Sequence, residues 1–160
     1  MRVIQAPNRP QDAAPGTFLY PCPWVFLAGS IEMGTAENWQ SRLITQLKDI
    51  EGTIWNPRRD AWDPSWEQQA SNPQFREQVE WELNYLEAAD RIWMYFDPTT
   101  KSPVTLLELG LLAWGVVSLT VCCPDGFWRK GNVEIVCEKY QIPLVHTFDD
   151  FVARIKKELQ

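Results

Sequence analysis

Short apolar runs alternate with segments of helical periodicity from residue 24 to the end of the chain. Each run is too short for a buried helix, and most end near glycine, proline or aspartate, which is typical of strands buried on both faces. We expect strands over residues 24–28, 53–56, 90–96, 116–123 and 143–146. Strands that alternate with amphipathic helices predict an α/β fold with a five-stranded parallel sheet, a doubly wound, flavodoxin-like or Rossmann-like three-layer sandwich.

The chain has 160 residues, 45% of them hydrophobic, which suits a single domain with a full core. We assign residues 24–160 to this domain. Residues 1–23 contain five prolines and no cationic-then-apolar order, so we expect an extended N-terminal arm and not a secretory signal. The apolar run over residues 104–123 contains Glu108 and two glycines, which favours a buried helix and a buried strand over a membrane span.

Charge and composition restrict the function further. The net charge of −6 argues against a nucleic-acid polymer or an anionic membrane as partner and is compatible with a small ligand. The four cysteines form no CxxC pair or metal framework, so we interpret them as reduced core thiols of a cytoplasmic protein. His146 is the only histidine and is expected at a strand end, which disfavours a histidine metal site or a Ser-His-Asp triad. We therefore expect no metal and no cofactor, and carboxylates must carry any chemistry.

Glu108 lies inside the apolar stretch 103–115. A buried carboxylate without a partner either costs several kcal/mol or becomes protonated, so its presence there indicates a function. A helix N-terminal position and a buried ion pair are the structural alternatives.

A doubly wound sheet binds ligands beyond the carboxyl ends of its strands, where the strand order reverses. For the strand order 2-1-3-4-5, this point lies between the first and third strands. It brings together Gly29, the loop 57–72 and the segment 97–108. The Gly29 turn lacks a GxGxxG or P-loop pattern, which disfavours a dinucleotide or triphosphate. Its glycine is either a simple turn residue or a point where a sugar or heterocycle approaches the backbone.

Several carboxylates accompany Glu108 near this crevice, namely Glu82, Asp90, Asp60 and Asp63. Paired carboxylates are typical catalytic groups of glycosyl transfer, because one attacks or stabilises the anomeric carbon and the other transfers a proton to or from the leaving group. A solvated helix face is the alternative for Glu82. A turn cap before a strand is the alternative for Asp90.

Three segments resemble the nucleoside 2-deoxyribosyltransferases and the related nucleotide N-glycoside hydrolases. They are Phe26-Leu-Ala-Gly-Ser30, the helix-to-strand segment 82–90, and residues 102–113 with Leu107-Glu108-Leu109-Gly110. The resemblance extends over about residues 23–147. It implies that Glu108 attacks C1′ of a 2′-deoxynucleoside to give a covalent deoxyribosyl-enzyme, which a second base resolves with retained configuration.

The resemblance also implies roles for neighbouring residues. Glu82 falls where the family carries an acidic residue, more often Asp, that handles the proton of the base. Ser102 falls where transferases carry an Asp near the sugar and nucleotide hydrolases a Ser near the phosphate. The first loop opposes a phosphate, because it has no Arg and contains Glu32.

Phe26 stands where many members carry a Tyr that holds the nucleophile, which leaves Tyr95 or a residue of the loop 57–66 for that role. Asn132 is similar to an asparagine that reaches a neighbouring subunit's site and binds the sugar 5′-hydroxyl. This similarity implies a homo-oligomer with shared sites. A helix N-cap is the alternative for Asn132.

Base recognition would fall to the loop 57–72. Trp62 or Trp66 can stack on a base there, and Asp60 or Asn56 can read its edge. Packing into an oligomer interface is the alternative for each tryptophan.

The expected function is transfer of 2-deoxyribose between nucleobases, with 2′-deoxynucleosides and free purine or pyrimidine bases as substrates. A nucleoside or nucleotide N-glycoside hydrolase, in which water resolves the intermediate, is the first alternative. A non-catalytic nucleotide-binding module is the second.

Overall fold

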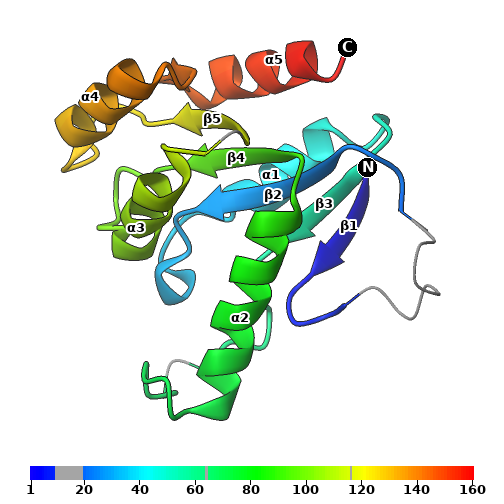
Figure 1. Ribbon diagram of the computed structural model, residues 1–160, viewed down its shortest axis with the longest axis vertical. Helices are drawn as coiled ribbons and strands as arrows, with labels where there is room; N and C mark the ends of the chain where they lie inside the picture. The colour runs from blue at the N-terminus through cyan, green and yellow to red at the C-terminus, as the bar shows by residue number, and fades with distance from the viewer. Residues whose placement is uncertain (10–19, 64, 116) are drawn as a thin grey trace.

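The computed structural model describes residues 1–9, 20–63, 65–115 and 117–160. Its strands are β1 (Arg2–Gln5), β2 (Trp24–Gly29), β3 (Thr53–Asn56), β4 (Arg91–Tyr95), β5 (Ser118–Cys122) and β6 (Leu144–Val145). Its helices are η1 (Glu32–Gly34), a 3₁₀ turn, and α1 (Trp39–Gln46), α2 (Pro73–Ala88), α3 (Pro103–Leu112), α4 (Lys130–Tyr140) and α5 (Phe148–Glu158). Within these residues, the strands form one parallel sheet of order β1-β3-β2-β4-β5-β6 (Figure 1).

The predicted α/β fold is confirmed, and the five expected strands follow the expected order. The sheet has a sixth strand, β1, which comes from the segment predicted to be an extended arm. Arg2 pairs with Thr53 and Gln5 with Asn56, so β1 extends the sheet at the edge beside β3. Residues 10–19 of the predicted arm lie outside the described residues.

The helices cover both faces of the sheet, because side chains alternate along each buried strand. In β4, Ile92 and Met94 pack into the cluster that contains residues of α2, α3 and α4. Trp93 and Tyr95 point to the opposite cluster, which α1 and α5 complete. In Figure 1, α2 passes in front of the strands and α1 lies behind them. The helices α2 and α3 therefore share one face of the sheet.

Local signals explain where the long helix α2 begins. Asn72 accepts hydrogen bonds from the backbone N–H groups of Gln74 and Phe75 through its side chain, and Pro73 occupies the first helical position. The stretch from Val104 to Cys123 forms α3 and β5, as expected, with Val116 outside the described residues. Among the described residues, no helix is both long and apolar enough to cross a membrane.

The cysteines and the histidine largely follow the sequence analysis. Cys122, Cys123 and Cys137 are buried free thiols, and burial raises their pKa values to about 12, about 12 and about 11. Cys22 is exposed, so it is not a core thiol as predicted. His146 follows β6, and its Nδ1 lies 3.1 Å from the carbonyl oxygen of Cys123. It is a strand-end residue with a backbone partner.

Candidate active site

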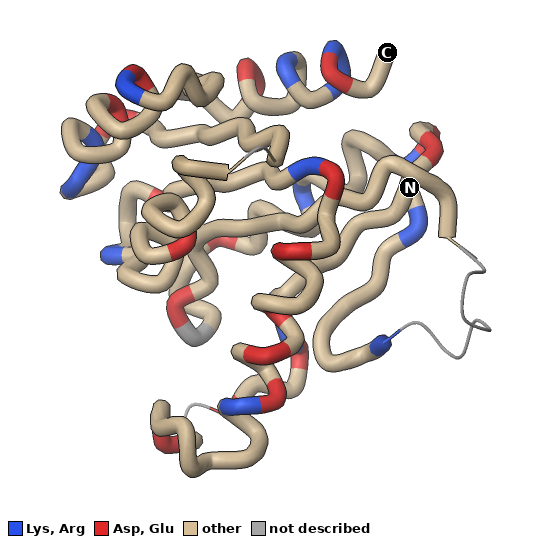
Figure 2. The backbone as a smooth tube through the Cα atoms, in the orientation of Figure 1, with Lys and Arg blue, Asp and Glu red and all other residues tan. Residues whose placement is uncertain are grey.

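Two carboxylates interact between neighbouring helices, Glu82 of α2 and Glu108 of α3. Burial and, to a smaller extent, the charge of Glu82 together raise the pKa of Glu108 to about 8. Burial also raises the pKa of Glu82 to about 7, against the effect of a hydrogen bond from Gln78. Because two nearby carboxylates cannot both ionise easily, the pair holds one proton near neutral pH. Figure 2 shows that acidic residues recur along α2, so sequence alone does not single out Glu82.

The environment of each carboxylate differs. Gln78 Nε2 donates to Glu82 Oε1 at 2.8 Å and lies 2.9 Å from the carbonyl oxygen of Pro57. This amide ties Glu82 to the first residue of the loop 57–72 and favours the ionised form of Glu82. Among the described residues, no side chain donates a hydrogen bond to Glu108 or forms an ion pair with it. The carboxylate of Glu108 is therefore the less restrained of the two.

A buried cluster of hydroxyl groups joins the end of β2 to the segment between β4 and α3. Ser30 Oγ accepts the backbone N–H of Asp97 at 2.8 Å and lies 3.2 Å from Thr100 Oγ1. Ser102 Oγ hydrogen-bonds to Ser30 Oγ and, at 2.7 Å, to Thr100 Oγ1. Ser30, Thr100 and Ser102 are each almost fully buried. These contacts fix the position of the start of α3 relative to the sheet. Because Glu108 lies on α3, they also help to fix the position of Glu108.

Packing explains the glycine at the end of β2. Gly29 has a φ of 144°, and a Cβ there would lie 2.4 Å from the carbonyl oxygen of Tyr95 and 2.9 Å from the ring of Trp39. The approach of β2 to β4 at the strand reversal therefore requires glycine, with or without a ligand.

The two residues that precede α3 are held by a distant side chain. Ser102 is the N-cap residue, with φ 47° and no capping hydrogen bond from its own hydroxyl. Instead, the Glu32 carboxylate accepts the backbone N–H of Lys101 at 2.9 Å and that of Ser102 at 3.2 Å. Glu32 thus lies beside the hydroxyl cluster.

The two tryptophans of the loop 57–72, whose residue 64 lies outside the described residues, pack on each other. Trp62 contacts Trp66 edge to face, with ring centroids 5.2 Å apart, and the Arg59 guanidinium lies 5.1 Å from the Trp66 ring centroid. Asn56 is buried at the end of β3 and accepts the backbone N–H of Arg58. Asp60 is exposed.

The Arg58 side chain anchors this loop to the segment before α1. Its guanidinium donates to the carbonyl oxygens of Ala36 and Glu37, each at 3.0 Å, and lies 3.3 Å from Gln40 Oε1. These contacts hold the loop against the neighbouring side of the crevice. The three acceptors, two backbone carbonyls and one side-chain amide, are uncharged, so Arg58 forms no ion pair with them.

Several proposed site residues lie away from the carboxylate pair. Asp90 precedes β4 at the amino-terminal edge of the sheet, where its carboxylate accepts the backbone N–H of Trp24 at 2.8 Å. Phe26 is fully buried in the core, and Tyr95 belongs to the cluster on the face opposite α3, so Tyr95 does not hold Glu108. Asn132 is exposed in the first turn of α4 and is not its N-cap, which is Arg129.

Sequence reasoning missed two residues that organise the site. Gln78 lies one helical turn before Glu82, an i,i+4 spacing that predicts contact once Glu82 is singled out. No sequence pattern around Thr100 indicates its role, because that role is a hydrogen bond to Ser30, which is distant in the sequence.

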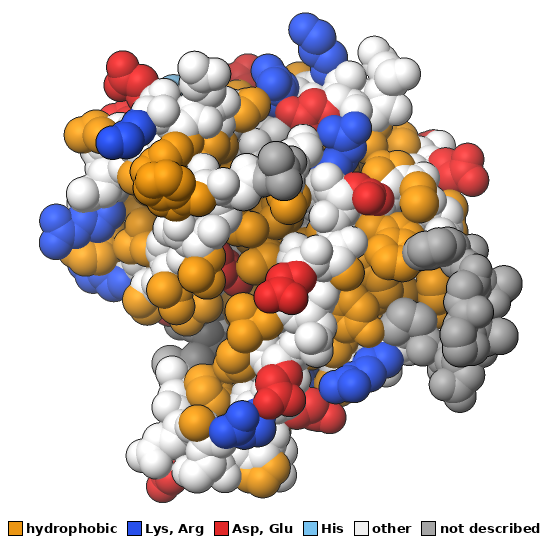
Figure 3. Space-filling view, in the orientation of Figure 1, with side chains coloured by type: hydrophobic (Ala, Val, Ile, Leu, Met, Phe, Trp, Pro, Cys, Tyr) orange, Lys and Arg blue, Asp and Glu red, His pale blue; other side chains and the backbone are white. Residues whose placement is uncertain are grey.

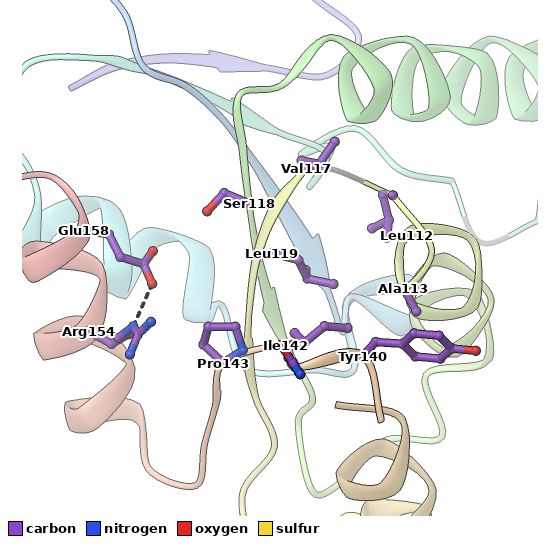
Figure 4. A pocket seen from close by; sticks show the side chains of 12 residues that line it. Leu112, Ala113, Val117, Ser118, Leu119, Tyr140, Ile142, Pro143, Arg154 and Glu158 are labelled. Atoms are coloured by element: carbon purple, nitrogen blue, oxygen red, sulfur yellow. Dashed lines mark hydrogen bonds and ion pairs between the residues drawn. The ribbon is translucent and has the colours of Figure 1, made fainter. Parts of the chain in front are cut away.

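A cavity of about 310 Å³ lies elsewhere, between the ends of α3 and α4, the start of β5, and α5. Figure 4 shows Arg154 and Glu158 paired at one side of it, with Leu112 and Tyr140 at the other. Neither Glu82 nor Glu108 lines this cavity, so it is separate from the carboxylate pair.

Comparison with known proteins agrees with this architecture. A conserved protein from Enterococcus faecalis V583, known from a crystal structure, matches with a TM-score of 0.60 and 13% identity, over 85% of this chain and 98% of that one. This likeness concerns the fold alone. The chain has no match among curated proteins. Residues 22–127 match the model of the family described as nucleoside 2-deoxyribosyltransferase like. Because this match covers more than half of the chain, the protein belongs to the nucleoside 2-deoxyribosyltransferase-like family.

Proposed function

We propose that the protein transfers 2-deoxyribose between nucleobases, with Glu108 as the nucleophile. The single observation that carries this proposal is the interaction of Glu108 with Glu82, two carboxylates whose pKa values are raised to about 8 and about 7. Two such groups divide the roles of nucleophile and proton carrier, as in retaining glycosyl transfer. Membership of the family supports the same chemistry.

In the first half-reaction, a Glu108 oxygen attacks C1′ of the deoxynucleoside and the bond between C1′ and the base nitrogen breaks. Glu82 gives its proton to the departing base. In the second half-reaction, a nitrogen of the incoming base attacks C1′, the ester bond to Glu108 breaks, and Glu82 takes the proton of that base. Each group returns to its starting state, and the configuration at C1′ is retained.

The reactive form of the pair has its one proton on Glu82. In the free protein, Gln78 favours the opposite arrangement, because its N–H stabilises an ionised Glu82. Positive charge that develops at C1′ in the transition state stabilises an ionised Glu108 and draws the proton to Glu82. Binding of substrate therefore selects the reactive tautomer, and the pair as a whole titrates with two apparent pKa values.

The base is proposed to occupy the space beside the loop 57–72. Its contacts would be Trp62, which offers a ring face, and Asn56 and Asp60, which offer acceptors. The hydrogen bond from Gln78 to Pro57 supports this position, because it links the loop to Glu82. The sugar is proposed to lie between Gly29 and Ser102.

We also propose that the protein forms a homo-oligomer through α3. Val104, Leu107 and Leu111 of α3 and Trp114, which follows the helix, have 57%, 63%, 59% and 81% of their surface exposed. Figure 3 shows hydrophobic side chains gathered over this helix. Ile135 of α4 is a further large apolar side chain that is 65% exposed. A second copy is the proposed occupant, because an exposed apolar patch on a soluble protein is typical of a protein–protein interface.

Sedimentation tests this interface. Leu107→Asp is expected to give monomers, whereas Ser41→Asp, an equal change of charge on the exposed side of α1, is expected to leave the assembly intact. A monomeric wild-type protein would refute the oligomer, and with it the proposed contribution of Asn132 to a neighbouring site.

Incubation with 2′-deoxyinosine, with and without free adenine, tests the proposed activity. New deoxyadenosine that requires adenine and disappears in Glu108→Ala is the expected result. Release of hypoxanthine without formation of deoxyadenosine would indicate that the protein hydrolyses the nucleoside and does not transfer its sugar. No product from 2′-deoxyinosine or its monophosphate would indicate a binding module.

A further inference from the structure

The N-terminal segment 1–9 packs against two parts of the proposed site. Its strand β1 extends the sheet next to β3 and lies outside residues 22–127, which match the family model (Figure 1). Ile4 is buried in the same apolar cluster as Trp81 of α2. Because Trp81 directly precedes Glu82, this segment packs on the helix that carries one of the two carboxylates.

A side chain of β1 also holds the start of the loop 57–72. Gln5 Nε2 donates a hydrogen bond to the carbonyl oxygen of Arg58 at 2.9 Å. The backbone N–H of Ala6 donates to the carbonyl oxygen of Asn56 at 3.0 Å. The N-terminal segment therefore binds the chain on both sides of the point where β3 ends and the loop begins.

The same segment binds α2 directly. The indole N–H of Trp81 donates to the carbonyl oxygen of Asn8 at 2.8 Å. One turn earlier on α2, Gln78 donates to the carbonyl oxygen of Pro57 and to Glu82. The N-terminal segment, the loop and α2 are thus hydrogen-bonded to one another in all three combinations. The start of the loop is held from two sides, by Gln78 and by the N-terminal segment.

Arg58 is the residue through which this hold reaches the proposed site. Its backbone N–H donates to Asn56 Oδ1 at 3.1 Å, and its guanidinium binds carbonyl oxygens of the segment before α1. Among the described residues, Gln5 supplies the hydrogen bond to its carbonyl oxygen. The proposed contacts of the base, Asn56, Asp60 and Trp62, lie on either side of Arg58 in the sequence. The position of Arg58 therefore affects where all three of them lie.

We propose that Gln5 is a positioning residue, which acts through Arg58 and holds the loop 57–72 in the conformation that receives the base. The edge strand β1 then serves the site as well as the sheet. The consequence for binding of the base rests on the proposed function, whereas the hold on the loop rests on the hydrogen bonds alone.

Hydrogen exchange of single backbone amides, followed by NMR, tests the hold on the loop. Gln5→Met keeps the length of the side chain and removes its donor without adding charge. The Arg58 amide is expected to exchange about fivefold faster or more, because one hydrogen bond no longer opposes local opening. The Val121 amide, which donates to the carbonyl oxygen of Pro143 in another part of the sheet, is expected to change by less than about twofold.

Gln46→Met is the matched control, because Gln46 is exposed at the last position of α1. It is expected to leave both amides unchanged. Gln5→Glu, which puts a carboxylate oxygen in place of the donor, repeats the test if Gln5→Met fails to fold. Equal acceleration of the Arg58 and Val121 amides would mean that Gln5 only stabilises the fold. No acceleration at Arg58 would mean that the loop holds itself. Either result would overturn the proposal.

Steady-state kinetics of base exchange test the consequence for the site. With saturating 2′-deoxyinosine, Gln5→Met is expected to raise the KM of adenine about fivefold and to change kcat by less than about twofold, because the loop contacts the base in the ground state and in the transition state alike. An unaltered KM would also overturn the proposal. A wild-type protein without exchange activity would refute the proposed function, and the Arg58 amide would then decide by itself whether Gln5 holds the loop.

Discussion

Replacing Glu108 by glutamine should make the folded protein less sensitive to rising pH. An unfolded glutamate ionises near pH 4.5, whereas burial and Glu82 raise the pKa of Glu108 to about 8 in the fold. Between these values the folded state binds more protons than the unfolded state. A raised carboxyl pKa therefore contributes stability that is complete below the unfolded value and is lost as the pH rises through the folded value.

The size of the effect follows from the same pKa values. One extra proton in the folded state lowers the free energy of unfolding by about 1.4 kcal/mol for each pH unit. From about pH 5 to about pH 7.5, Glu108 in the wild-type protein accounts for a loss of about 3 kcal/mol. Glu108→Gln removes this titration and the repulsion of Glu82. The variant should thus gain about 3 kcal/mol relative to the wild type over that interval.

Urea unfolding at a series of pH values measures this difference directly. Glu87→Gln is the control, because Glu87 is exposed on α2 and its replacement removes the same charge without touching the pair. The control curve should run parallel to the wild-type curve. If the Glu108→Gln curve also runs parallel to it, Glu108 is not a buried carboxylate of raised pKa, and the chemistry proposed for the pair loses its basis.

Three further predictions concern the surroundings of the pair. Gly29→Ala should lower stability by about 2 kcal/mol or more, because its Cβ would lie 2.4 Å from the Tyr95 carbonyl oxygen; an unchanged melting temperature would contradict this. Gln78→Leu removes a donor that lowers the pKa of Glu82, so the alkaline limb of the exchange rate, where Glu82 loses its proton, should move to higher pH, and an unmoved limb would exclude this role. Trp62→Ala should raise the KM of the acceptor base about tenfold in steady-state assays, and an unaltered KM would assign the ring to packing alone.

The alternation of strands and helices was predictable because its signals are local. Each buried strand is a continuous apolar run, and the helix faces repeat at regular spacing, so the sequence from Trp24 onward contains the whole alternation. The edge strand β1 escaped prediction because its apolar content is small and its partner is distant. Val3 and Ile4 pair with Ile54 and Trp55, some fifty residues away, and no local pattern indicates that pairing.

Parts of the site were open to prediction and parts were not. Glu108 was conspicuous as a charge in an apolar helix, whereas Glu82 was one of several candidate carboxylates and only the family resemblance gave it a particular role. Asp90 could have been excluded from the sequence, because a residue that precedes a parallel strand lies at the edge opposite the ligand. The contact of Ser30 with Thr100 was inaccessible, since a hydrogen bond between residues of two connections depends on the finished sheet.

The arrangement of the pair follows from the connectivity of three consecutive elements. Helix α2 leads into β4, and β4 leads into α3, so the two helices flank one strand and run beside each other on one face of the sheet. A carboxylate on the side of α2 that meets α3 then confronts one on the facing side of α3. Partial burial of both costs stability, which the large apolar cluster around Trp81 and Phe26 offsets. Apolar residues at these two positions would stabilise the contact between the helices. A site that transfers a group together with a proton needs both carboxylates in spite of this cost, whereas a binding site for a neutral ligand does not.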